Sequence, residues 1–213
     1  MTELLLKALL AYLLGNIMGG HIVGRLRGID LGQVGSGNVG ATNALRTQGK
    51  GFAVLVLLID VGKGIAGALL VPLLPLGSAS VSPEHLAYVC GAAVTLGHCY
   101  PALWGFKGGK GVATLAGVFG ALLPAALPAM LLGFVLVVML SGYVSLATLF
   151  AAALAGLYVA CFDAQGALSS AGAFTAFMAA LIVFKHRENI ARLMSGTENR
   201  FEKLRIIGRW LER

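Results

Sequence analysis

Long apolar runs cover most of this chain, and they restrict it to a fold that lies within a lipid bilayer. Only 12% of the residues are charged, whereas a soluble domain carries about 25%. A helix of about 20 apolar residues is long enough to cross the hydrocarbon core. We therefore predict an all-α integral membrane protein with a single domain over residues 1–213. The apolar runs span residues 4–23, 52–76, 85–104, 112–141, 144–162 and 170–184.

The number of crossings follows from the prolines and the basic residues. Pro124 and Pro128 divide the run 112–141 into two short helices, which gives about seven transmembrane helices. With seven crossings, every lysine and arginine except Lys7 and Lys63 falls in the odd-numbered loops or the C-terminal tail. Loops rich in lysine and arginine face the cytoplasm. The sequence therefore predicts an N-terminus outside the cell and a cytoplasmic C-terminus.

A polar, glycine-rich segment between the first two runs, residues 35–46, predicts an anion site. Its glycines let backbone N–H groups approach a ligand and it contains no carboxylate, although a flexible connector would have a similar composition. Gly35, Gly37 and Gly40 match a dinucleotide-binding pattern, but a long apolar run stands where that pattern needs a strand. Nucleotide hydrolysis is disfavoured as well, because Ala41 replaces the P-loop lysine. The candidate ligand-binding residues are Ser36, Gly37, Asn38, Gly40, Thr42, Asn43 and Arg46.

A second basic, glycine-rich segment follows the third run. Lys107 and Lys110 are interleaved with Gly108 and Gly109, and His98 lies a few residues before them. Backbone N–H groups of glycines, together with two cations, form a suitable nest for an anion. An ordinary cytoplasmic loop would need the lysines but not the surrounding glycines, so we favour a second anion site.

The segment after the last run predicts a polar helix face at the membrane surface. His186, Asn189 and Arg192 are spaced three apart, so they share one face of a helix. Histidine carries protons near neutral pH, and an asparagine amide can orient a hydroxyl. The alternative is an amphipathic tail that binds lipid heads.

The remaining reactive side chains predict no metal centre, no cofactor and no nucleic-acid partner. The three cysteines form no C-x-x-C pair, and the four histidines lack a metal-binding spacing. The net charge of +7 lies at the ends of apolar runs, where it meets anionic membrane lipid. Asp60 and Lys63 lie three residues apart inside the second run and can form an ion pair. That pair either neutralises itself or supports a cytoplasmic cavity, and both interpretations stay open.

Together, the three polar segments resemble the bacterial membrane-integral acyl-phosphate:glycerol-3-phosphate acyltransferases. The first family motif is matched by residues 36–46, the second by 97–101 with 106–114, and the third by 186–193 with 196–198. Their order and spacing agree, so the resemblance covers nearly the whole chain. It implies a multi-pass enzyme of the bacterial inner membrane with its active site on the cytoplasmic side. The implied reaction joins acyl phosphate and glycerol 3-phosphate into lysophosphatidic acid, the first acylation step of phospholipid synthesis.

The motifs suggest how the two substrates divide among the residues. The acyl phosphate head is expected at the glycines and hydroxyls of the first motif, together with Gly108 and Gly109. The phosphate of glycerol 3-phosphate is expected at three cations, Arg46, Lys107 and Lys110. All three motifs are expected to belong to one site.

The expected mechanism is direct attack of the glycerol hydroxyl on the acyl carbonyl. No serine, histidine and carboxylate arrangement supports an acyl-enzyme. His186 and Asn189 are the catalytic candidates, with His186 or a phosphate oxygen of the substrate as the base. His98 and Arg192 are further substrate-binding candidates, and Glu198 is expected to pair with an arginine or a helix N-terminus as a structural residue.

The main alternative from another class is a transporter of phosphate or an organophosphate. Two features of the sequence argue against it. The polar segments fall on one predicted face of the membrane, and no internal repeat relates the two halves of the chain.

Overall fold

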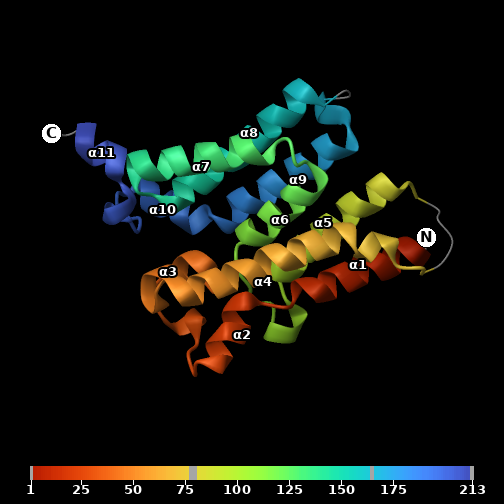
Figure 1. The fold of residues 1–213 in the computed structure, drawn as a ribbon, viewed down its shortest axis with the longest axis horizontal. Helices are drawn as coiled ribbons and strands as arrows, with labels where there is room; N and C mark the ends of the chain where they lie inside the picture. The colour runs from red at the N-terminus through yellow and green to blue at the C-terminus, as the bar shows by residue number, and fades with distance from the viewer. Residues whose placement is uncertain (1, 77–80, 164–165, 212–213) are drawn as a thin grey trace. The chain divides into compact units, whose positions relative to one another are not determined.

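The structure, a computed structural model, describes residues 2–76, 81–163 and 166–211, which form helices joined by turns (Figure 1). The chain divides into two compact units, Met1–Leu123 and Pro124–Arg213, and each is described by itself. The helical architecture agrees with the sequence prediction. The assignment of one domain to the whole chain stays a prediction.

In the first unit, the other helices gather around α4 (Lys50–Leu69). Two short helices that precede it in the chain and two longer ones that follow it pack against it: α2 (Gly19–Leu26), α3 (Ala41–Gln48), α5 (Pro83–Cys99) and α6 (Val112–Leu122). The first helix, α1 (Thr2–Gly15), packs along α5 (Figure 1). Three 3-10 helices complete the unit: η1 (Leu31–Gln33), η2 (Val71–Leu73) and η3 (Ala102–Trp104).

The helix predicted over residues 4–23 is interrupted in the structure. It stops at Gly15, and α2 begins at Gly19. The cause is non-local, because the break is held by the segment around η3. The Asn16 side-chain oxygen accepts a hydrogen bond from Leu103 N at 3.0 Å, and the Asn16 carbonyl accepts one from Trp104 Nε1 at 2.9 Å. The break therefore places the start of α2 beside the second polar segment.

The second unit is built on the antiparallel neighbours α7 (Leu127–Ser141) and α8 (Val144–Phe162), which a left-handed Gly142 connects. The next helix, α9 (Ser170–Lys185), packs on α8, and α10 (Arg187–Met194) follows it after a single residue. The C-terminal α11 (Ile206–Leu211) lies against α7. Two 3-10 helices, η4 (Gly166–Leu168) and η5 (Glu202–Leu204), lie in the connections.

The lengths and surfaces of the helices are those of a membrane protein. Among the described residues, four segments are long and apolar enough to cross a bilayer: Thr2–Leu26, Lys50–Leu73, Pro83–Trp104 and Val144–Phe162. Three shorter apolar helices are α6, α7 and α9. On α4, Leu58 is 63% exposed whereas Asp60 is 1% exposed, the reverse of the pattern in a soluble protein.

The predicted division of the run 112–141 is confirmed. The helix α6 ends at Leu122, and α7 begins at Leu127 with Pro128 in its first turn. A proline in the middle of a helix would remove a backbone hydrogen bond, whereas the first turn tolerates it. The count of seven crossings and the placement of the termini stay predictions.

Candidate functional site

The first polar segment is shaped by one buried side chain, Asn43 of α3. Its Oδ1 accepts a hydrogen bond from Ser36 N at 2.9 Å, and its Nδ2 donates to Leu31 O at 3.2 Å and Val34 O at 2.9 Å. At Gly35, φ is +60°, and a Cβ there would overlap Asn43 Oδ1. The amide of Asn43, which is 1% exposed, therefore acts as an internal brace of the loop.

The rest of this segment presents backbone and small polar groups. Ser36 and Gly37 are exposed, and Asn38 and Thr42 are half-buried. The helix α3 follows Gly40, which provides no side-chain cap for the first turn. The N–H groups at an uncapped helix start attract anions. Arg46, half-buried in the last turn of α3, is the cation of this segment.

The second polar segment lies directly on His98, near the end of α5. Gly109 N donates a hydrogen bond to His98 O at 3.2 Å. A Cβ at Gly108 would overlap this carbonyl oxygen, and a Cβ at Gly109 would overlap His98 Nε2. The two glycines are therefore required for the chain to pass so close to the histidine. On either side of them, Lys107 is exposed and Lys110 is half-buried.

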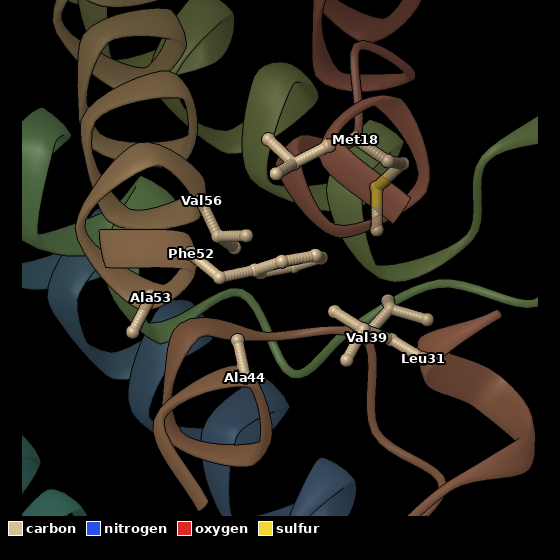
Figure 2. Packing of buried hydrophobic residues seen from close by; sticks show 8 residues of the cluster. Met18, Leu31, Val39, Ala44, Phe52, Ala53 and Val56 are labelled. Atoms are coloured by element: carbon tan, nitrogen blue, oxygen red, sulfur yellow. The ribbon is translucent and has the colours of Figure 1, made fainter. Parts of the chain in front are cut away.

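One hydrophobic cluster lies beneath the first polar segment (Figure 2) and extends to Trp104, which precedes the second. Trp104, which precedes the second segment, packs against the cluster, as do Ala41 of the first segment and Val34 just before it. His21 of α2 stacks on the Trp104 ring with centroids 4.2 Å apart, and Arg25 lies 4.4 Å above the same ring. The first glycine-rich segment thus rests on this core, and the chain enters the second segment from Trp104 at its edge. The buried members of the core are Met18, Val23, Leu31, Val39, Ala44, Phe52, Ala53 and Val56.

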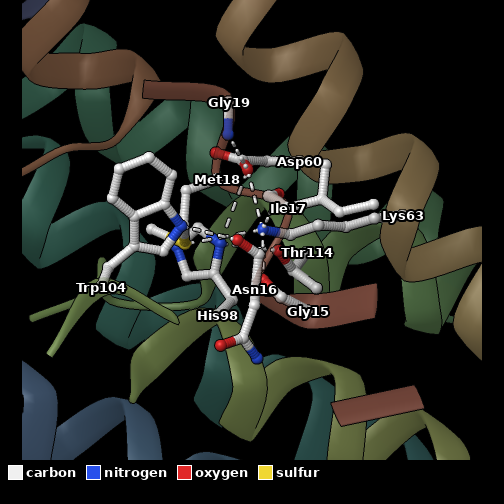
Figure 3. Close-up of polar contacts among 10 residues, drawn as sticks. All are labelled: Gly15, Asn16, Ile17, Met18, Gly19, Asp60, Lys63, His98, Trp104 and Thr114. Carbon is white, nitrogen blue, oxygen red and sulfur yellow. Dashed lines mark hydrogen bonds and ion pairs between the residues drawn. The ribbon is translucent and has the colours of Figure 1, made fainter. Parts of the chain in front are cut away.

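A buried polar cluster lies behind the second segment (Figure 3). The expected ion pair is present, with Lys63 Nζ 3.0 Å from Asp60 Oδ1. The sequence did not reveal that two other helices contribute to it. His98 Nδ1 lies 3.5 Å from Asp60 Oδ1 and 3.1 Å from Thr114 Oγ1 of α6. No local pattern connects residues 60, 98 and 114, so only the packing of α4, α5 and α6 brings them together.

The third polar segment belongs to the second unit and is organised by Glu198. Its Oε1 accepts hydrogen bonds from Asn189 Nδ2 at 2.7 Å and Ser145 Oγ at 3.1 Å, and its Oε2 accepts one from Arg192 Nε at 2.7 Å. The expected pairing of Glu198 with an arginine is thus present. His186, between α9 and α10, is 3% exposed, and its Nδ1 lies 2.8 Å from Ile182 O.

The charge of Glu198 is stabilised by this network. Burial by itself would raise the pKa of Glu198. Hydrogen bonds from Asn189, Arg192 and Ser145, with the positive charge of Arg192, outweigh burial and hold the pKa below its ordinary value of 4.5. The carboxylate therefore stays ionised at neutral pH and fixes Asn189 and Arg192 on one face of α10. The Arg192 side chain keeps 34% exposure, so its guanidinium still reaches solvent.

The structure thus brings the first and second polar segments together in one unit and places the third in the other. Each cluster combines hydrogen-bond donors with fixed cations beside apolar helices. That a single site unites all three stays a prediction.

Comparison with known proteins identifies the class of this helical membrane protein as an acyltransferase. The family model "Glycerol-3-phosphate acyltransferase" matches residues 5–196. A glycerol-3-phosphate acyltransferase of Geotalea daltonii is 42% identical over 203 residues, covering 95% of this chain and 100% of the relative. One of Aquifex aeolicus is 41% identical, covering 92% of this chain and 98% of the relative.

Two crystal structures share the fold. They are of PlsY (YgiH), an integral membrane glycerol 3-phosphate acyltransferase, in its glycerol 3-phosphate form and its lysophosphatidic acid form. Their TM-scores are 0.83 and 0.81, at 38% identity over 96% of this chain and 98% of each PlsY chain. The chain belongs to the glycerol-3-phosphate acyltransferase family, and it is a membrane enzyme.

Proposed function

We propose that this enzyme transfers a fatty acyl group from acyl phosphate to the sn-1 hydroxyl of glycerol 3-phosphate. The hydroxyl oxygen forms a new ester bond with the acyl carbonyl carbon, and the bond from that carbon to the phosphate oxygen breaks. The products are lysophosphatidic acid and inorganic phosphate. The PlsY structures support the acceptor and the lipid product, because one is a glycerol 3-phosphate form and the other a lysophosphatidic acid form.

The observation that carries the proposal is that one unit holds two glycine-lined segments, the first on the hydrophobic core and the second directly after Trp104, which packs on that core. A helix without a side-chain cap begins within the first segment, α3 after Gly40, and another directly follows the second, α6 after Gly111. Uncapped N–H groups bind phosphate oxygens without a positively charged side chain. An acceptor and a donor that both carry phosphate would use two such segments.

Within this proposal the two phosphates are held by different chemistry. The acyl phosphate head binds backbone N–H groups and hydroxyls of the first segment, including Ser36 and Thr42. It also lies against the backbone of Gly108 and Gly109, where Gly109 N–H is held by His98 O. The dianionic phosphate of glycerol 3-phosphate binds fixed cations, which suit a free phosphate in water. These cations are Arg46, Lys107 and Lys110.

The reaction proceeds without an acyl-enzyme. Acyl phosphate is a mixed anhydride with phosphate as its leaving group, so alignment of the two substrates lowers the barrier more than a covalent nucleophile would. Cys90 and Cys99 are buried, and neither lies in a glycine-rich segment. Backbone N–H groups of the second segment stabilise the developing oxyanion.

Two groups can accept the hydroxyl proton, and a single variant separates them. With His186 Nδ1–H donated to Ile182 O, Nε2 is the basic nitrogen. The other base is an oxygen of the acyl phosphate itself. If His186 is the base, His186→Gln lowers turnover by roughly 10²- to 10⁴-fold. High residual turnover with a flat pH profile assigns the proton to the substrate phosphate.

The donor is tested with purified enzyme in detergent. We expect release of inorganic phosphate from palmitoyl phosphate only when glycerol 3-phosphate is present, in equal amount to the lysophosphatidic acid formed. Palmitoyl-CoA and palmitoyl-acyl carrier protein serve as competing donors at the same concentration. Faster transfer from either thioester, or phosphate release without the acceptor, would contradict the proposal.

The enzyme is further proposed to reside in the bacterial inner membrane, with its polar segments facing the cytoplasm. The excess of lysine and arginine in the loops of one side supports that orientation. Reporter fusions after Gly40 and after Lys110 test it. Both fusions should report the cytoplasm, whereas opposite sides for the two positions would exclude a shared phosphate site.

A further inference from the structure

The buried cluster of Asp60, Lys63 and His98 has more polar contacts than a self-neutralising pair requires. Lys63 is fully accounted for as a structural cation. Its ammonium lies 3.0 Å from Asp60 Oδ1 and donates to Gly15 O at 3.0 Å and Ile17 O at 2.8 Å, where α1 ends. Carbonyls at a helix C-terminus attract a cation. The Lys63 side chain is 2% exposed, so these contacts replace its hydration.

Asp60 differs because its carboxylate also reaches outside the pair. Oδ1 accepts a hydrogen bond from Gly19 N at 3.2 Å and lies 3.5 Å from His98 Nδ1, while Oδ2 is buried and has no hydrogen-bond partner among the described residues (Figure 3). A charge placed only to neutralise Lys63 would not need to face a histidine on another helix. The additional contact points towards the second polar segment.

His98 carries this contact to the backbone of the second segment. Nδ1 lies 3.5 Å from the Asp60 carboxylate and 3.1 Å from the Thr114 hydroxyl, and with its proton on Nδ1 the ring is oriented by both oxygens. The opposite edge of the ring, Nε2, lies so close to Gly109 that no Cβ fits there. The His98 carbonyl also accepts the hydrogen bond from Gly109 N. The chain of contacts therefore runs from Asp60 through His98 to Gly109.

We propose that Asp60 is a positioning residue of the acyl transfer, which acts through His98 to set the backbone of Gly108 and Gly109 and the direction of the flanking Lys107 and Lys110. This inference rests on the proposed binding of phosphate by the second segment. Asp60 is 1% exposed and does not itself contact a substrate in this account. A displacement of about 1 Å in a positioning group lowers turnover by as much as 100-fold.

The test removes the carboxylate and its counterion together, so that no unpaired charge stays buried. In Asp60→Leu/Lys63→Met, the charge balance is kept, but His98 loses the carboxylate and keeps only the Thr114 hydroxyl beside Nδ1. We expect kcat/KM for glycerol 3-phosphate to fall by roughly 10- to 100-fold, mostly through a higher KM. Asp60→Asn/Lys63→Met keeps an oxygen for His98, so it should recover most of that loss. If leucine prevents folding, Asp60→Ala/Lys63→Met replaces it.

A second buried ion pair in the same unit provides the matched control. Lys7 Nζ lies 2.7 Å from Glu3 Oε1, and their side chains are 4% and 10% exposed. Lys7 also donates to Pro72 O at 2.7 Å, so this pair ties α1 to η2 and not to a glycine-rich segment. Glu3→Leu/Lys7→Met should lower the melting temperature about as much as the Asp60 variant but leave kcat/KM per folded protein unchanged.

A double-mutant comparison tests whether Asp60 acts through His98. His98→Asn should reduce kcat/KM in the wild type but by less than about twofold in Asp60→Leu/Lys63→Met, because both changes break the same chain of contacts. Wild-type kinetics in Asp60→Leu/Lys63→Met, or full additivity with His98→Asn, would overturn the inference. Each ratio is measured with whichever donor supports transfer in the wild type. If acyl phosphate fails as a donor, the proposed function is refuted, but the role of Asp60 is still tested with the donor that works.

Discussion

The two units differ in which groups form their polar surfaces. In the first unit, glycine-rich backbone forms the surface of the cluster, and side chains such as Asn43 and His98 brace it from behind. In the second unit, side chains on α10 form the surface, and a carboxylate, Glu198, holds them in place. The conformation of the glycine-rich segments in the first unit thus depends on close packing. The conformation of the α10 side chains in the second unit depends on an ionised carboxylate. Substitutions in the two units should therefore lower activity and stability for different reasons.

The largest effect is expected where the backbone fits most tightly. Gly109→Ala places a methyl group against His98 Nε2, and the buried ring can give way only by leaving its contacts with Asp60 and Thr114. We expect a loss of kcat/KM of about 100-fold and a destabilisation of about 1–3 kcal/mol. Acyl-transfer kinetics and thermal unfolding in detergent measure the two quantities.

Gly62→Ala is the matched control for that substitution. Gly62 lies in α4 of the same unit, and an added Cβ meets no atom within 4 Å. Its activity should equal that of the wild type, and its melting temperature should be equal or slightly higher, because alanine favours a helix interior over glycine. If the activity of Gly109→Ala lies within twofold of the control, the second segment tolerates displacement. Close packing would then not distinguish the first unit from the second.

A smaller effect is expected from the brace of the first segment. Asn43→Ala removes the hydrogen bonds that the Asn43 amide makes to Ser36 N and Leu31 O, while Val34 O keeps the bond from Gly37 N at 3.1 Å. Each buried polar group without a partner costs about 1–3 kcal/mol, although water reaches an exposed loop and lowers that cost. We expect a lower melting temperature and a KM raised by about tenfold as the loop loses its shape.

Gln48→Ala tests whether any shortened polar side chain of α3 has the same result. Gln48 is the last residue of this helix and takes no part in the brace of Ser36, Leu31 and Val34. It should leave KM unchanged. A normal KM in Asn43→Ala would mean that Asn43 does not set the conformation of the segment.

In the second unit, loss of charge should have a more moderate effect. Glu198→Gln keeps the size of the side chain but removes the ionised acceptor of Arg192 and Asn189. We expect about 1–2 kcal/mol of destabilisation, since Arg192 is 34% exposed and water screens part of the attraction. Turnover should fall only about three- to tenfold, because the donor atoms on α10 remain.

Glu188→Gln is the control for that variant on the same helix. Glu188 Oε1 lies 3.8 Å from Arg187 Nη2, and both side chains are largely exposed. Exposed pairs contribute little to stability, so neither the melting temperature nor the turnover should change. An equal effect of the two glutamine variants would mean that the Glu198 network is not specific.

The sequence was most informative where a local rule decides the structure. Pro124 and Pro128 divide one apolar run, because a helix interior does not tolerate proline, and the division was predicted to within a few residues. The ion pair of Asp60 and Lys63 follows from their spacing on a helix. The three motifs identify the family, because their order and spacing do not depend on the details of packing.

Non-local contacts account for what the sequence could not predict. An asparagine in a glycine-rich loop has the same pattern whether it faces a ligand or the interior, and Asn43 proved to face the interior. The break after Gly15 depends on contacts between Asn16 and residues 103 and 104, almost 90 positions away. The link between Asp60 and His98 likewise requires the packing of α4 against α5.

The smallest effect concerns the acidity of Glu198. Its pKa in the folded protein lies below the ordinary value of 4.5, so the folded state binds a proton less readily than the unfolded state. The stabilisation by this carboxylate is therefore complete above about pH 5 and is lost as the pH falls below 4.5 and through the folded-state pKa. Glu198→Gln has no such titration.

The difference in melting temperature between wild type and Glu198→Gln should accordingly stay constant from about pH 7 to pH 5 and narrow at lower pH. All other carboxylates are common to the two proteins, so the difference reports Glu198 alone. A difference that widened on acidification would mean that the folded protein favours protonated Glu198. The second cluster would then be held by a neutral hydrogen bond instead of a charge, and the distinction between the two units would disappear.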